Sequence, residues 1–181
     1  MDQFEYVFSL IGLLLGLSLV EVLSGLVKAR KARSVVRIGW LTPMLGVIVI
    51  LHVTSFWGMT WNLRDFLPPT IWQSLGVGVL ISGAYYLAAS AVFPEHPEQF
   101  DDLDSYYWLH KREVFGIILA CSLAVQVIGL ARGWSLTPIA VAINLPVFTG
   151  MAVGCFSRNR LVDLIVLGSV IAVLTANLAI P

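Results

Sequence analysis

The chain contains 181 residues, of which 58% are apolar and 12% are charged, and eleven basic side chains balance eleven acidic ones. The charged share is about half that of soluble domains, and the fifteen glycines bring the non-polar share to about two-thirds. This composition excludes a strongly basic nucleic-acid-binding protein and a disordered chain. With only two cysteines, it also excludes a disulfide-rich secreted domain. It predicts a polytopic membrane protein whose surroundings are the lipid bilayer.

Six apolar stretches are long enough to cross the ~30 Å hydrocarbon core as helices, which takes about 20 residues each. Their apolar residues do not alternate with polar ones, as the strands of a membrane β-barrel would. We therefore predict an all-α fold, a six-transmembrane-helix bundle that forms a single domain over residues 1–181. The expected spans are 8–27, 41–62, 71–93, 114–131, 136–155 and 161–180, with a polar insert at 94–112 after the third.

Basic residues are distributed unevenly between the loops at the two ends of the bundle. Arg64 and Arg132 are alone in the second and fourth loops, whereas nine basic residues lie in the first, third and fifth. Because Lys and Arg accumulate in cytoplasmic loops, this imbalance places both termini outside. Acidic Asp2 and Glu5 replace the basic start of a secretory signal, so we expect the first span to be retained. The nine basic residues are Lys28, Arg30, Lys31, Arg33, Arg37, Lys111, Arg112, Arg158 and Arg160.

A short motif occurs twice, as GWLTP at 39–43 and as GWSLTP at 133–138. A repeat of three spans would be inverted in the membrane, as in many transporters. The charge distribution agrees, because the first copy is predicted inside and the second outside. The local interpretation is that Thr and Pro begin a helix while Trp anchors it at the interface. A 3+3 inverted repeat and two similar helix starts therefore both stay open.

Polar side chains within the apolar spans are candidate functional groups, because they are costly at membrane depth. Glu21 lies in the first span, His52 near the middle of the second, Gln126 in the fourth and Asn144 in the fifth. Pro146 follows Asn144 closely, removes a backbone donor and suggests a helix break of the kind that binds ions or substrates in transporters. The structural alternatives are a protonated or lysine-paired Glu21, a packed His52 and a simple proline kink.

Cofactor and catalytic motifs are not found. A haem would need a second histidine at the depth of His52, but His96 and His110 are both in the polar insert. Cys121 and Cys155 lie on different spans without zinc-ligand spacing, so we expect free thiols. No HExxH motif and no pair of intramembrane aspartates occurs. We therefore predict no cofactor, no metal site and no catalytic residue, and enzymatic activity has no support.

Two GxxxG motifs permit close approach between helices. Gly12 and Gly16 form the first, and Gly150 and Gly154 form the second. Either motif could pack inside the bundle or against another subunit. A homo-oligomer and a partner in a membrane complex are therefore both open.

The segment 94–112 combines acidic and aromatic residues at helical spacing, which predicts an amphipathic helix in the cytoplasmic membrane interface. Its residues Asp101, Asp102 and Asp104 could dock a cytoplasmic partner or pair with the basic loop at 28–37. That loop also suits contact with anionic lipid headgroups. The residues expected to make this lipid or partner contact are Lys28, Arg30, Lys31 and Arg33.

FEYV at 4–7, LGLSL at 15–19 and YYW at 106–108 resemble a group of small uncharacterised proteobacterial polytopic membrane proteins. Asp102, Arg112 and Phe115 extend the likeness, which covers most of the chain. The resemblance implies a bacterial inner-membrane location and supplies no activity, ligand or catalytic residue.

These features favour a small channel, a carrier or a subunit of one, with a polar track through the bundle. Glu21 would be its charge or proton site, His52 a titratable neighbour, and Asn144 with Pro146 the coordinating backbone. The alternative is a non-transporting scaffold or sensor that recruits a partner through residues 94–112. No nucleic-acid partner is expected.

Overall fold

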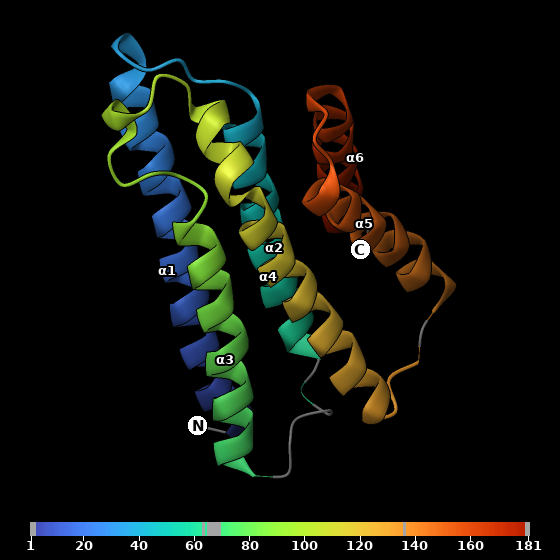
Figure 1. Cartoon of the computed structure of the whole chain (residues 1–181). Helices are drawn as coiled ribbons and strands as arrows, with labels where there is room; N and C mark the ends of the chain where they lie inside the picture. Colours follow the sequence, from blue (N-terminus) through green and yellow to red (C-terminus); the bar gives the residue numbers. More distant parts are fainter. Residues whose placement is uncertain (1–2, 63, 65–69, 136, 180–181) are drawn as a thin grey trace.

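The computed structural model describes residues 3–62, 64, 70–135 and 137–179, and Figure 1 shows how its helices are arranged. The predicted span ends at residues 136 and 180 lie outside the described residues. Within the described ranges the chain forms six long α-helices and two single-turn 3-10 helices, and no strand. All six α-helices are long and apolar enough to cross a membrane, which confirms the predicted all-helical, multi-pass architecture.

The helix bounds match the predicted spans closely except in α1 and α4, which are both longer than expected. The α-helices are α1 (Gln3–Lys31), α2 (Leu41–Asn62), α3 (Ile71–Ser90), α4 (Leu103–Ala131), α5 (Pro138–Phe156) and α6 (Arg160–Ala179). The 3-10 helices are η1 (Ala32–Ser34), after α1, and η3 (Pro97–Gln99), before α4.

Side-chain caps explain where three helices begin. Thr70 Oγ1 accepts a hydrogen bond from the Gln73 N–H at the start of α3, and Thr137 Oγ1 accepts one from the Ala140 N–H at the start of α5. Asp102 caps α4 in the same way, with its carboxylate accepting from the Asp104 N–H at 2.9 Å. Each cap satisfies a backbone donor that the first turn of a helix leaves unpaired.

α2 has the most helix neighbours in the bundle. It contacts α1, α3, α4 and α6, while α1 also lies along α3. α5 packs between α4 and α6, so that α5 and α6 stand together on the side of the bundle away from α1 (Figure 1). Close approach is built in by small residues: a Cβ on Gly25 would lie 2.6 Å from the Phe93 side chain, and one on Gly78 would lie 2.9 Å from Ile11.

The segment 103–112 differs from its prediction. These residues form the first turns of α4 and continue into its apolar part, so the separate amphipathic interfacial helix is not shown. The physical reason is that Tyr107 and Lys111, which a headgroup-facing helix would expose, are 1% and 2% exposed and turn into the protein. Asp102 caps the helix, whose first residue, Leu103, lies eleven residues before the start of the predicted span.

The two halves of the chain pack differently. α1 and α3 lie side by side over much of their length, whereas the corresponding pair in a 3+3 repeat, α4 and α6, does not pack backbone against backbone. Those two helices meet through side chains at one end, where Tyr107 and Lys111 reach Asp163. The inverted repeat is therefore not shown by the helix packing and stays a prediction.

Candidate functional site

A cavity of about 220 Å³ lies between α2, α3, α4, α5 and α6. It brings together three of the polar residues that the sequence singled out, namely His52 on α2, Gln126 on α4 and Asn144 on α5. The other polar lining residues are Ser55, Tyr85, Ser122, Ser135 and Asn177. The apolar lining consists of Phe56, Met59, Val125, Trp134, Ala140, Ile143, Val147, Phe148 and Leu174.

The cavity extends from the middle of the helices toward the α4–α5 connection. His52 follows the start of α2 by eleven residues, or about 16 Å at 1.5 Å per residue, which is half the length of that helix. Trp134 and Ser135, in contrast, belong to the connection between α4 and α5. By the distribution of basic residues, this connection is on the side predicted to be outside.

Two buried polar atoms in the cavity lack hydrogen bonds of normal geometry to any described residue. They are His52 Nδ1 and Ser55 Oγ, one turn apart on α2. The His52 side chain is only 6% exposed and has the Ile48 carbonyl as its backbone neighbour. Buried polar groups are nearly always paired, so two such atoms facing one space are suited to a bound molecule or to water.

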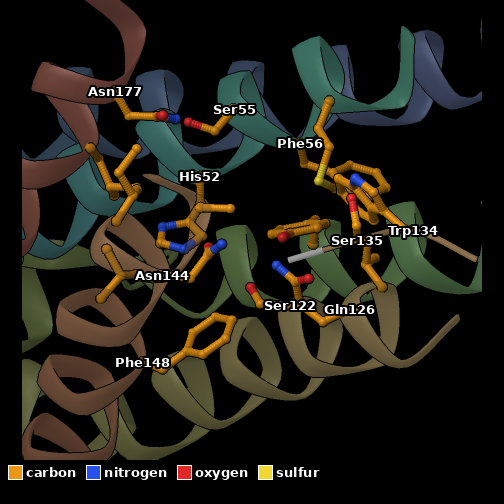
Figure 2. A pocket seen from close by; sticks show the side chains of 17 residues that line it. His52, Ser55, Phe56, Ser122, Gln126, Trp134, Ser135, Asn144, Phe148 and Asn177 are labelled. Carbon is orange, nitrogen blue, oxygen red and sulfur yellow. The ribbon is translucent and has the colours of Figure 1, made fainter. Parts of the chain in front are cut away.

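The remaining polar side chains come from three other helices. Figure 2 shows the Asn144 amide beside the His52 ring, Gln126 next to Ser122, and Asn177 facing Ser55. The Tyr85 side chain is hydrogen-bonded to Ser122, which links α3 to α4 at the cavity wall. Ser55, Ser122 and Asn177 were not proposed as site residues from the sequence. Asn177 could have been proposed, because it is an amide side chain near the end of an apolar span.

Pro146 lies inside α5 without ending it, because the helix runs from Pro138 to Phe156. Its side chain is exposed, while Asn144 and Val147 on either side of it line the cavity. Proline removes one backbone donor and leaves the carbonyl four residues earlier without its helical partner. The polar group that the described part of α5 contributes to the cavity is thus the Asn144 side chain.

Glu21 is not part of this site. It lies partly buried on α1, and α1 contributes no described residue to the cavity lining. The structure therefore places the predicted charge site and His52 in different parts of the protein.

The two GxxxG motifs occupy different surroundings. A Cβ on Gly150 would lie 2.7 Å from Val170 on α6, and one on Gly154 would lie 2.8 Å from the Phe115 ring on α4. A Cβ on Gly12 would only touch Trp57 at 3.6 Å, and one on Gly16 would have no described atom within 4 Å. The second motif therefore holds α5 against its neighbours, whereas the first leaves space at Gly16.

The acidic residues around the start of α4 make hydrogen bonds to other parts of the chain. The Arg37 N–H donates to the Asp101 carbonyl, and the Leu103 N–H donates to the Arg37 carbonyl, both at 3.1 Å. Asp104 is 6% exposed, and its carboxylate accepts hydrogen bonds from the Leu41 N–H and from Arg160 Nη2, each at 3.1 Å. Asp101 stays exposed, as do Lys28, Arg30, Lys31 and Arg33.

A second polar cluster, which was not predicted, lies at the opposite end of α4, α5 and α6 from the α4–α5 connection. Lys111 Nζ donates to Asp163 Oδ2 at 2.5 Å and to the Ser157 carbonyl at 2.8 Å. Tyr107 Oη donates to the same carboxylate oxygen at 2.9 Å. From the sequence alone, Lys111 counts only as a charge in a loop. If α4 is extended to residue 103, Lys111 lies one helical turn after Tyr107, and this spacing was the signal that the two side chains share a helix face.

Potential cofactor ligands are scattered. Among the described residues, no group of three or more His, Cys, Asp and Glu side chains is arranged to hold a metal ion. Cys121 and Cys155 are buried free thiols, as expected. The His110 ring stacks on Tyr106 with 4.1 Å between centroids, and His96 Nδ1 lies 3.3 Å from Glu98 Oε1.

Comparisons with protein-family models, curated proteins and solved structures gave no match to this chain.

Proposed function

We propose that this membrane protein binds a small solute in the cavity lined by α2, α3, α4, α5 and α6. It would act as a carrier or as the solute-binding subunit of one. The observation that carries the proposal is the cavity, in which His52 Nδ1 and Ser55 Oγ make no hydrogen bond of normal geometry to a described residue and lie at the depth of the helix middles. A polar, concave site within apolar helices is the usual form of a membrane transporter's binding site.

The packing below the cavity favours a carrier over an open channel. Between the cavity and the Lys111–Asp163 cluster lies an apolar layer whose side chains are at most 1% exposed. The layer consists of Phe115, Ile118, Met151, Leu167 and Val170. A solute could leave toward the Lys111 end only if α4, α5 and α6 moved apart, which is the alternating access of a carrier.

The scaffold alternative has less support from the geometry. Four polar residues of the segment expected to recruit a partner make hydrogen bonds within the chain. They are Asp102, Asp104, Lys111 and Arg112. Recruitment through residues 94–112 stays a prediction and would depend on the exposed Glu95, Glu98 and Asp101.

The proposal is tested by solute flux into proteoliposomes. Vesicles are exposed to glycerol, urea, benzamide, potassium chloride or a pH step, and entry is followed by light scattering or by an internal dye. We expect at least one solute to enter faster with the wild-type protein than in protein-free vesicles. The Asn144→Leu variant should abolish this difference, whereas Thr149→Leu should preserve it, because Thr149 is exposed on the same helix away from the cavity.

Protein-free rates for every solute in this assay would rule out the carrier role. Glu21→Gln is included as a separate variant, because it tests the charge-site role predicted from the sequence independently of the cavity.

A further inference from the structure

We infer that the solute bound in this cavity is an uncharged, flat ring compound that carries both hydrogen-bond donors and acceptors, such as a ring amide. This inference rests on the proposed function and adds the chemical class of the ligand. Three properties of the lining carry it: its lack of charge, the chemistry of its polar atoms, and its aromatic walls.

The lining offers no counter-charge. None of its described residues is Asp, Glu, Lys or Arg. The charged side chains of Lys111 and Asp163 are also buried, but they do not line the cavity and are paired with each other. A charged ligand taken from water into such a site would lose its hydration without gaining an opposite charge, which is strongly unfavourable.

The polar atoms of the lining suit a ligand with mixed hydrogen-bonding groups. The amides of Gln126, Asn144 and Asn177 each present a donor and an acceptor. His52 Nδ1 and Ser55 Oγ are buried and make no hydrogen bond of normal geometry to a described residue. A ligand that both donates and accepts would satisfy these atoms, whereas a hydrocarbon would leave them unpaired at a cost.

The walls and the size favour a ring. Phe56, Trp134 and Phe148 contribute aromatic side chains, and Figure 2 shows Phe148 and Trp134 on different sides of the space toward which His52, Asn144 and Gln126 turn. Aromatic side chains stack well on flat rings. The volume of 220 Å³ corresponds to about seven water molecules at ~30 Å³ each, which is too large for a bare ion and suits a small ring compound.

Three probes of nearly identical shape test the inference: benzamide, which is neutral, benzoate, which is an anion, and benzamidinium, which is a cation. Their binding to the full chain in lipid nanodiscs is measured by ligand-observed saturation-transfer NMR, with empty nanodiscs as the blank. We expect benzamide to bind and both charged probes to bind at least about tenfold more weakly, because each would carry an uncompensated charge into the cavity.

Variants locate the binding. Asn144→Leu should remove the benzamide signal and Thr149→Leu should retain it. Ser55→Ala, which deletes one hydroxyl and leaves the packing intact, should weaken it several-fold. A charged probe that bound as tightly as benzamide, with the same dependence on Asn144, would overturn the neutral class and leave the proposed solute site standing. Failure of benzamide to bind in an Asn144-dependent way would overturn the inference as well, and the flux experiment then decides the proposed function on its own.

Discussion

Lys111 Nζ lies 2.5 Å from Asp163 Oδ2, and the two side chains are 2% and 0% exposed. The pair joins α4 to α6, and the bond from Lys111 to the Ser157 carbonyl adds the end of α5. The ammonium group also lies 4.2 Å from the centre of the Trp108 ring. Because both charges are removed from solvent, each depends on the other, and this buried pair holds the end of the three helices together with the Asp104–Arg160 pair.

Removing the lysine charge should therefore be costly. Lys111→Met leaves Asp163 buried and unpaired, and we expect a loss of about 3–5 kcal/mol in the free energy of unfolding. The double variant Lys111→Met with Asp163→Leu should regain most of that loss, because no buried charge is left. Thermal unfolding of the purified protein in detergent measures both. Equal destabilisation by the single and the double variant would contradict the ion-pair account.

Gly39 should tolerate no side chain. A Cβ at this position would overlap the Asp104 carboxylate, which caps the start of α2 and binds Arg160. We expect Gly39→Ala to destabilise the protein by ~1–3 kcal/mol, the range for a side chain forced into packed surroundings. Gly116→Ala is the matched control, since a Cβ there has no described atom within 4 Å. Similar melting temperatures for the two variants would show that Asp104 moves aside freely.

The two GxxxG motifs should respond differently to substitution. Gly150→Leu would drive a side chain into Val170 and should lower the melting temperature clearly, because α5 and α6 would be forced apart. In Gly16→Leu the new side chain would begin in open space, because a Cβ there has no described atom within 4 Å, so the stability of the single chain should be nearly unchanged. If Gly16→Leu instead reduced the size of the detergent-solubilised particle, as measured by light scattering, this motif would be a contact between subunits.

The cavity should be reachable by water from one side of the membrane. In a background where Cys121 and Cys155 are replaced by Ala, Asn144→Cys should react with a membrane-impermeant methanethiosulfonate reagent. Thr149→Cys should react slowly, because a thiol facing lipid forms little of the reactive thiolate. The distribution of basic residues predicts labelling from outside the cell. Labelling of Asn144→Cys from the cytoplasmic side alone would mean that the topology is inverted.

Much of the architecture was predictable because it depends on local sequence. Spans 41–62 and 71–93 lie within three residues of the observed α2 and α3, since length and hydropathy decide where a helix can cross lipid. The start of α4 was not predictable from hydropathy alone. Residues 103–112 mix apolar and charged side chains, and the burial of Tyr107 and Lys111 in the tertiary structure shows that they continue the helix.

Three polar residues of the candidate cavity could be singled out one by one from the sequence, but the group that they form could not. A polar side chain in an apolar span stands out without any knowledge of its neighbours, and His52, Gln126 and Asn144 were found in this way. Glu21 met the same criterion and yet lies on a helix that does not line the cavity. Lys111 and Asp163 were missed as a pair because 52 residues separate them in the chain.

The sequence by itself determined that this is a multi-pass helical membrane protein, because apolar length is a property of each segment alone. The tertiary structure decided which polar groups share a space and which charges neutralise each other. Those relations depend on the rotation of each helix about its axis and on its choice of neighbours. Both are set by contacts such as Gly154 against Phe115, between residues far apart in the chain.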